Sequence, residues 1–256
     1  MTHGADRFPG WFAALETRHL ADRTFAEVRR GLVALSSLYV RRGRRLETGG
    51  ALEGEGKRAA FALFYAPLHF LVVRGIVRAL GAASPAPSRI VDLGCGTGTS
   101  GAAWAIEAGV GCRVDGVERS GWAAEESIWN YRVLDVAGRV RRGDLGRAEL
   151  PGARAGVLAA YTVNELADDA RARLLPRLLE AARRGARVLV VEPIARRPFP
   201  WWDDWSDAFR REGGRENPWR FAVDLPERLR LLDRAAGLDH RELTGRSLYL
   251  EAPGRR

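Results

Sequence analysis

Cysteine is scarce in this sequence. Only two of 256 residues are cysteine, Cys95 and Cys112. Two cysteines cannot build a disulfide framework or a four-cysteine metal site, and they suit a reducing compartment, so we expect a cytoplasmic protein. Three histidines, His19, His69 and His240, stand isolated, and no metal-ligand spacing is present. We therefore expect no metal site and treat these histidines as structural.

Long hydrophobic runs are also missing. The longest apolar run, Ala59 to Val73, contains Pro67 and His69 and is shorter than the roughly 20 residues that span a bilayer. The first ten residues lack the basic start, apolar core and cleavage site of a secretory signal. We expect no membrane partner. A hydrophobic content of 46% and a charged content of 29% are typical of an ordinary globular protein.

Lysine is nearly absent, and arginine supplies almost all the positive charge. The formal net charge is +9, and residues 1–90 hold 14 Lys plus Arg against 7 Asp plus Glu. One stretch carries six arginines: Arg29, Arg30, Arg41, Arg42, Arg44 and Arg45. Such a stretch attracts phosphate, which makes RNA or a ribosomal subunit a candidate partner. The alternative is a solvated helical face.

The N-terminal third is expected to be helical. Between Gly10 and Val40, apolar residues recur mostly at spacings of three, four or seven, which predicts amphipathic helices. A glycine-rich loop over Gly43 to Gly56 and a third helix over Lys57 to Leu80 follow. Two prolines within 82–88 indicate a linker. We therefore divide the chain into a helical N-terminal cap region, 1–85, and a second domain, 86–256.

The second domain alternates short apolar strands with helical stretches, which predicts a mostly parallel α/β sheet. The list of expected strands is Arg89–Leu93, Arg113–Val117, Val140–Arg142, Gly156–Tyr161, Ala186–Glu192, His240–Leu243 and Ser247–Glu251. Helices are expected at about Thr99–Ala108, Trp122–Ala137, Asp168–Arg183 and Pro226–Ala236. An aromatic insertion, about 193–224, has a loop-like pattern.

The first strand runs into glycines and then a helix, in Ile90-Val91-Asp92-Leu93-Gly94-Cys95-Gly96-Thr97-Gly98-Thr99. Glycines let the backbone approach a ligand closely, and the helix offers free amides, so a nucleotide-like cofactor is implied. NAD would place a pyrophosphate beside Asp92 without visible compensation. S-adenosylmethionine carries an ammonium and a sulfonium group, which a carboxylate favours. We therefore prefer the methyl donor to NAD.

Two further acids end the next two strands. Glu118 lies 20 residues after Gly98, a spacing that brings a carboxylate to ribose hydroxyls. Asp144 follows the third strand and is expected to accept a hydrogen bond from the adenine amino group. The alternative for both is a solvated acid at a strand end. Cys95 is expected to be only a small residue in the loop.

Asp92-x-Gly94-x-Gly96-x-Gly98, with Glu118 and Asp144, resembles the class I S-adenosylmethionine-dependent methyltransferases. The resemblance implies a Rossmann-like seven-stranded sheet with a reversed last strand, S-adenosylmethionine as cofactor and S-adenosylhomocysteine as product. It also implies that Asp92 holds the methionine amino group through water, and that the main chain at Ala160 and Tyr161 flanks the methionine part. The remaining implied cofactor contacts are Gly94, Cys95, Gly96, Gly98, Thr99, Arg119 and Leu145.

A narrower group of motifs is similar to the ribosomal small-subunit methyltransferase-like family first known from mitochondria. The motifs are Tyr65-Ala66, Gly98-Thr99 with Trp104-Ala105, Glu118-Arg119-Ser120, Asn164-Glu165-Leu166 and Val191-Glu192. This similarity implies rRNA or ribosome-assembly partners. Members of that family carry cysteines that bind an iron-sulfur cluster, whereas this chain has no cysteine after Cys112.

Two regions are candidates for contact with a methyl acceptor. After the fourth strand, Asn164 and Glu165 are expected to orient or deprotonate the acceptor, with Tyr161 beside them; helix capping is the alternative. In the aromatic insertion, five residues are candidates for substrate binding: Trp201, Trp202, Trp205, Arg215 and Trp219. Packing onto the N-terminal helices is the alternative for these aromatics.

Three functional hypotheses remain, and the oligomeric state is not predicted. The first is a methyltransferase that acts on RNA, slightly favoured by the basic N-terminal third. The second is a methyltransferase for a small molecule in an aromatic-walled pocket. The third is a ribosome-assembly factor that binds the donor without catalysis.

Overall fold

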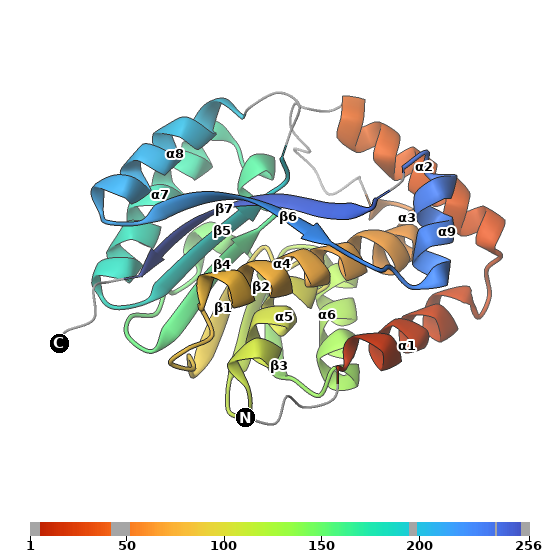
Figure 1. Ribbon diagram of the computed structural model, residues 1–256, viewed down its shortest axis with the longest axis horizontal. Helices are drawn as coiled ribbons and strands as arrows, with labels where there is room; N and C mark the ends of the chain where they lie inside the picture. The colour runs from red at the N-terminus through yellow and green to blue at the C-terminus, as the bar shows by residue number, and fades with distance from the viewer. Residues whose placement is uncertain (1–5, 42–51, 195–198, 239, 252–256) are drawn as a thin grey trace.

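The fold is a three-layer arrangement in which helices cover both faces of a central sheet (Figure 1). It was obtained as a computed structural model, which describes residues 6–41, 52–194, 199–238 and 240–251. The greater part of the glycine-rich loop expected at Gly43 to Gly56 lies outside the described residues. So do Arg42, Arg44 and Arg45 of the basic stretch.

One seven-stranded sheet runs through the molecule in the order β3-β2-β1-β4-β5-β7-β6. Its strands are β1 (Arg89–Leu93), β2 (Arg113–Glu118), β3 (Ala137–Arg142), β4 (Ala155–Ala160), β5 (Arg187–Glu192), β6 (Arg215–Ala222) and β7 (Glu242–Glu251). Only β7 is antiparallel to its neighbours, β5 and β6. The predicted fold class, mostly parallel with a reversed last strand, is confirmed.

Two strand assignments were wrong, although the total of seven was right. The strands expected at His240–Leu243 and Ser247–Glu251 are one strand, β7, and the missing strand is β6, inside the stretch expected to be loop-like. β6 escaped notice because Pro218 and four charged or amide residues interrupt its pattern. As an edge strand that pairs with β7 alone, it tolerates a proline.

Helices divide between the two faces of the sheet. On one face lie α5 (Thr99–Ala108), α6 (Gly121–Val133) and α4 (Ala66–Leu80), and on the other α7 (Asp168–Arg183) and α8 (Pro200–Arg211). The predicted helices at Thr99–Ala108 and Asp168–Arg183 are confirmed residue by residue. The helix expected at Trp122–Ala137 ends at Val133, because β3 begins at Ala137 and needs the intervening residues to reverse the chain.

The N-terminal helices pack at the end of the sheet where the parallel strands finish. They are α1 (Phe8–Leu20), α2 (Phe25–Arg41), α3 (Glu55–Ala60) and the π-helical turn η2 (Phe61–Tyr65), which continues into α4. Near the C-terminus, α9 (Glu227–Ala235) joins them and contacts α2 (Figure 1). Side chains of α1, α2 and α4 share one hydrophobic core with β1, β2 and β4. The division of the chain at residue 85 stays a prediction.

Among the described residues, one helical stretch, Glu55–Leu80, is long and apolar enough to cross a bilayer. Of its most apolar 18-residue window, 67% is buried inside the protein, as in the core helix of a globular fold.

Candidate functional site

The glycine loop between β1 and α5 lies at the carboxyl edge of the sheet, and its backbone requires glycine. Gly94, Gly96 and Gly98 have φ angles of 65°, 54° and 77°, a region that side chains disfavour. A Cβ atom on Gly94 would lie 2.5 Å from Cγ2 of Thr162, and one on Gly98 would lie 2.7 Å from the ring of Tyr131. The side chains of Thr162 and Tyr131 therefore pack closely against the loop.

Polar side chains of α6 fix this loop through hydrogen bonds. The Ser127 hydroxyl donates to the Gly96 carbonyl at 2.7 Å, and the Asn130 amide donates to the Thr97 carbonyl at 2.9 Å. Asn130 in turn accepts a hydrogen bond from the indole N–H of Trp11, on α1, at 2.7 Å. The N-terminal helix thus reaches the glycine loop through one buried amide. These residues were not among the predicted site residues, although polar residues on the face of α6 that packs against the loop were a usable signal.

Glu118, at the end of β2, holds the same loop from its other side. Its Oε2 accepts a hydrogen bond from the Gly96 N–H at 3.0 Å, and its Oε1 accepts one from the Ser120 N–H at 2.7 Å. Each oxygen retains a lone pair for a further donor. The structure therefore brings together the glycine loop and the acid that the sequence had assigned to the same site.

Asp92 lies at the base of the loop, 1% exposed, and its Oδ2 accepts a hydrogen bond from the Gly101 N–H at 3.0 Å. Burial, together with the charge of Glu118, raises its pKa to about 7, although the hydrogen bond from Gly101 opposes the shift. Cys95 is buried beside Ser127, with Sγ 3.8 Å from the hydroxyl oxygen, and burial raises its thiol pKa. Such a thiol is not activated as a nucleophile, in keeping with its expected role as a small loop residue. Thr99 is buried where α5 begins.

The chain after β4 forms the second side of the site. Ala160 is buried, and Tyr161 has a φ of 57°, unusual for a residue with a side chain. The Thr162 hydroxyl lies 3.1 Å from the Gly94 carbonyl oxygen, so this segment contacts the glycine loop directly. The ring of Tyr161 stacks on His69, in α4, with 3.7 Å between ring centroids and 12° between planes.

Asn164, Glu165 and Glu192 continue the carboxyl edge of the sheet. The backbone N–H of Asn164 donates to Oε1 of Glu192 at 3.1 Å. Glu192, at the end of β5, is 1% exposed. Burial, with a contribution from the charge of Glu165, raises its pKa to about 8. Desolvation by the surrounding protein is the main cause that raises the pKa of Glu165 to about 7. The charge of Arg119 opposes this shift, and that of Glu118 adds to it. Glu192 was not among the predicted site residues, although a glutamate closing an apolar strand was a usable signal.

The expected adenine contact, Asp144, lies at the surface beyond β3. Asp144 is exposed, and its Oδ1 accepts a hydrogen bond from the Gly146 N–H at 2.8 Å, which caps the short helix Leu145–Arg147. Arg119 is exposed at the end of β2. The role of Asp144 with adenine stays a prediction.

The aromatic residues expected to form a wall in 193–224 divide between the two faces of the sheet. Trp202 and Trp205 are buried in the core between α8 and the sheet, with Trp201 packed against the same core, whereas Trp219 packs on the opposite face. The Trp202 indole N–H donates to Glu216 at 2.7 Å, and that of Trp219 donates to Ser247 at 2.8 Å. Arg215 is exposed, and its guanidinium donates to the Leu80 carbonyl. Trp202 and Trp205 are buried and serve the packing of α8, whereas substrate binding by Trp201, Arg215 and Trp219 stays a prediction.

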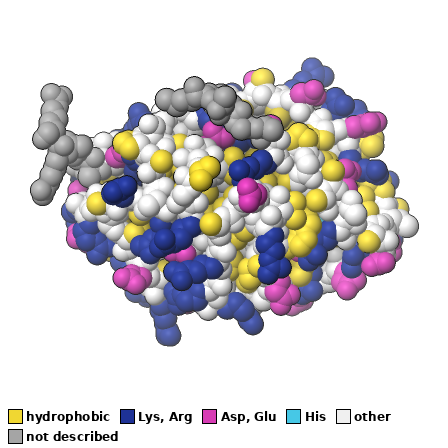
Figure 2. Space-filling view, turned by 90° about the horizontal axis from the view of Figure 1, so that it is seen from below, with side chains coloured by type: hydrophobic (Ala, Val, Ile, Leu, Met, Phe, Trp, Pro, Cys, Tyr) yellow, Lys and Arg dark blue, Asp and Glu magenta, His cyan; other side chains and the backbone are white. Residues whose placement is uncertain are grey.

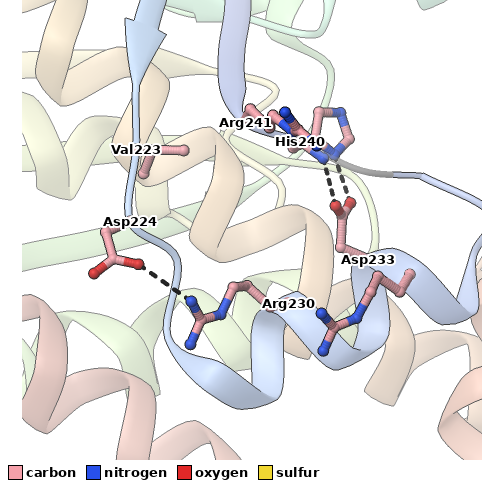
Figure 3. Close-up of a pocket in the computed structure, with 7 residues that line it drawn as sticks. Val223, Asp224, Arg230, Asp233, His240 and Arg241 are labelled. Carbon is pink, nitrogen blue, oxygen red and sulfur yellow. Dashed lines mark hydrogen bonds and ion pairs between the residues drawn. The ribbon is translucent and has the colours of Figure 1, made fainter.

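An arginine-lined pocket lies apart from the glycine loop, where α9 meets the ends of β6 and β7 (Figure 3). It encloses about 220 Å³ and is lined by Val223, Asp224, Arg230, Asp233, Arg234, His240 and Arg241. Buried Asp233 accepts hydrogen bonds from the backbone and the ring of His240, and Arg230 pairs with Asp224. A shallower pocket on α2 is lined by Ala26, Arg29, Arg30 and Val33.

Charge elsewhere on the surface is mixed. Basic and acidic side chains lie among one another on the face in Figure 2, so that face is not a continuous basic surface. Within the described ranges, no group of three or more His, Cys, Asp and Glu side chains is arranged to hold a metal ion.

Comparison with known proteins identifies the fold. No protein-family model matches the chain, and no curated protein sequence matches it either. Among solved structures, a proposed class I S-adenosylmethionine-dependent methyltransferase from Listeria monocytogenes is similar with a TM-score of 0.53 and 10% identity, over 99% of this chain and 90% of that one. The magnesium protoporphyrin IX methyltransferase of Synechocystis, solved with bound S-adenosylmethionine, is similar with a TM-score of 0.50 and 15% identity, over 87% of this chain and 97% of that one. Mitomycin 7-O-methyltransferase is similar with a TM-score of 0.50 and 17% identity, over 95% of this chain and 73% of that one.

The chain therefore has the fold of the class I S-adenosylmethionine-dependent methyltransferases, and the expected resemblance is confirmed at that level. The narrower similarity to the ribosomal small-subunit family stays a prediction.

Proposed function

We propose that this protein is an S-adenosylmethionine-dependent methyltransferase. The observation that carries the proposal is the set of acids at the carboxyl edge of the sheet: Asp92, Glu118, Glu165 and Glu192. Asp92, Glu165 and Glu192 have raised pKa values. In each case the charge of another member of the set contributes to the shift. A pyrophosphate would add to this repulsion between carboxylates, whereas a cationic ligand would relieve it and favour the ionised form of each acid.

The residues of the site fit this donor. Glu118 keeps a free lone pair on each carboxylate oxygen for the ribose hydroxyls, and Asp92 is placed to hold the methionine amino group. We expect Ala160 and Tyr161 to flank the methionine part and Asp144 to accept a hydrogen bond from the adenine amino group. When bound, the donor supplies a methyl group on a sulfonium, and S-adenosylhomocysteine is the product.

Acceptor chemistry falls to the segment after β4. Alignment of the acceptor with the methyl group is the main task in methyl transfer, and good alignment supplies about 7–11 kcal/mol of the barrier. Glu165 has a pKa raised to about 7, which suits a general base at neutral pH. Asn164, whose backbone is held by Glu192, orients the acceptor beside it.

We favour RNA as the acceptor, which entails RNA binding. Support comes from the arginine-lined pocket of α9 and from the arginine pair on α2, a helix that contacts α9. Arg29 and Arg234 form no ion pair with any residue that the structure describes, so both are available for phosphate.

Both cysteines are free and buried, which suits the reducing cytoplasm.

A small-molecule acceptor is the alternative. Two of the structural neighbours are named for small-molecule acceptors, a porphyrin and mitomycin. A donor-binding ribosome-assembly factor without catalysis is the second alternative, because the chain is similar in motifs to a ribosomal family. A log-log slope of RNA affinity against salt near zero would exclude RNA, and release of S-adenosylhomocysteine with any acceptor would exclude the assembly factor.

Donor binding is tested by calorimetry with S-adenosylmethionine, S-adenosylhomocysteine and NAD. We expect the first two to bind and NAD not to bind. Glu118→Ala should weaken donor binding at least about tenfold, because hydrogen bonds to a charged group contribute about 1.5–3 kcal/mol. Glu149→Ala, at an exposed glutamate outside the site, is the matched control. Binding of NAD without binding of either adenosyl compound would overturn the proposal.

A further inference from the structure

We propose that four aromatic residues, Phe61, Tyr65, His69 and Tyr161, form the surface on which a planar ring of the acceptor stacks. We call this set the aromatic strip. The ring is either a nucleobase or the flat ring of a small molecule, since both offer the same π surface. This inference rests on the proposed function and names the chemistry of its acceptor.

The strip is continuous in space. Ring centroids are 5.8 Å apart between Phe61 and Tyr65, 6.2 Å between Tyr65 and His69, and 3.7 Å between His69 and Tyr161. Three members recur every fourth residue along one helix and therefore share a face of it. All four are partly exposed, whereas Phe64 on the same helix is fully buried. Burial in the core is thus not the whole role of these rings.

The strip ends beside the donor site. Tyr161 lies between Ala160 and Thr162, and the Thr162 hydroxyl contacts the Gly94 carbonyl of the cofactor loop. On its other side, the charge of Glu192 acts on the Tyr161 hydroxyl, whose pKa is raised mainly by burial. A ring stacked on the strip would therefore lie near both the methyl donor and the acids that handle the acceptor.

The backbone at both ends of the strip departs from regular geometry. Tyr161 adopts a φ of 57°, which glycine would adopt at lower cost, so the presence of a tyrosine calls for a role of its ring. Conformations of this kind cost of order 1–3 kcal/mol and cluster at functional sites. Phe61 and Tyr65 bound the π-helical turn η2, another feature frequent at functional sites.

The rings of the strip are neutral and fixed. Burial lowers the pKa of His69 to about 3, so its stack on Tyr161 joins two uncharged rings at physiological pH. The Tyr65 hydroxyl lies 3.2 Å from the Ser36 hydroxyl oxygen of α2, which holds that ring in place. Neutral, preorganised aromatic faces bind other flat rings by stacking, which contributes about 1–3 kcal/mol per base in nucleic-acid complexes.

The test uses 2-aminopurine, a fluorescent base that is quenched when it stacks. Two probes are titrated into the protein saturated with S-adenosylhomocysteine: 2-aminopurine riboside, and a short single-stranded RNA that contains one 2-aminopurine. Tyr65→Leu and Tyr161→Leu remove a ring, whereas Tyr65→Phe and Tyr161→Phe keep it. Circular dichroism and thermal unfolding establish that each variant is folded.

We expect quenching with at least one probe, a Kd raised about tenfold in the leucine variants, and a Kd within about twofold of the unsubstituted protein in the phenylalanine variants. Quenching of the riboside identifies a free ring as the ligand, and quenching of the RNA alone identifies a nucleobase in a strand. The inference is overturned if S-adenosylhomocysteine binds but neither probe is quenched, or if leucine and phenylalanine variants behave alike. Failure of S-adenosylhomocysteine to bind would instead overturn the proposed function.

Discussion

Asn130 joins the N-terminal helix to the cofactor loop, and its removal should weaken both. Its side chain donates to the Thr97 carbonyl and accepts from the Trp11 indole, and it is 1% exposed. Asn130→Ala leaves two buried polar groups without partners, since neither is open to water. A buried group that loses its only partner costs about 1–3 kcal/mol. We therefore expect the free energy of unfolding to fall by about 3 kcal/mol.

Unfolding in urea and by heat measures this loss. For a chain of this size a loss of 1 kcal/mol lowers the Tm by about 2–4 °C, so the Tm of Asn130→Ala should fall by about 6–12 °C. Trp11→Phe breaks one of the two hydrogen bonds and should cost about half as much. The double variant should cost less than the sum of the two single variants, because they share a hydrogen bond.

Asn217→Ala is the matched control. The Oδ1 atom of Asn217 is buried and has no hydrogen-bond partner, so its removal breaks no bond through that oxygen. We expect this control to cost well under 1 kcal/mol. Equal losses of unfolding free energy in Asn130→Ala and Asn217→Ala, or additive losses in the double variant with Trp11→Phe, would refute the role of Asn130 as the link between Trp11 and Thr97. S-adenosylhomocysteine affinity should fall in Asn130→Ala and not in the control.

Three further outcomes follow from the structure. Gly98→Ala should destabilise more than Gly213→Ala in urea unfolding, because both have positive φ but only Gly98 places a Cβ against Tyr131; equal losses would count against that contact. The pKa of Glu192, about 8, lies above that of an unfolded glutamate, so its ionisation destabilises the native state as pH rises from about 4 to 8. Glu192→Gln should therefore be more stable than the unsubstituted protein at pH 9 and not at pH 4. The same difference in stability at both pH values would refute the raised pKa. Residues 86–256 expressed alone should not unfold cooperatively, since the shared core would be exposed; a sharp thermal transition would contradict this.

Local patterns sufficed for the strands and the loop that form the donor site. β1 is a short apolar run that ends in Asp92 and glycine, and glycines at φ above 50° leave a clear mark in sequence. Glu118 could be placed beside them because parallel strands end at the same edge of a sheet. Each of these inferences needed only residues within one βαβ unit.

Contacts between distant segments could not be predicted in the same way. Trp11 and Asn130 are 119 residues apart, and nothing in the periodicity of either helix identifies the partner. The tryptophans of 193–224 were assigned to one wall because they crowd the sequence, yet strand alternation in β6 and the outward position of α8 send them to opposite faces of the sheet. The aromatic strip was missed for the same reason, since Tyr161, after β4, meets His69 of α4 only in the folded chain.

The N-terminal helices are part of the site and not a cover laid over it. α1 reaches the cofactor loop through Trp11 and Asn130, and α2 holds the Tyr65 ring through Ser36. The donor loop and the aromatic strip are therefore supported by two helices of the same bundle, which packs on the sheet through one core. A change in the packing of this bundle would alter the donor and acceptor sides together. Because methyl transfer depends on alignment of the two, the bundle sets the geometry on which the proposed reaction depends.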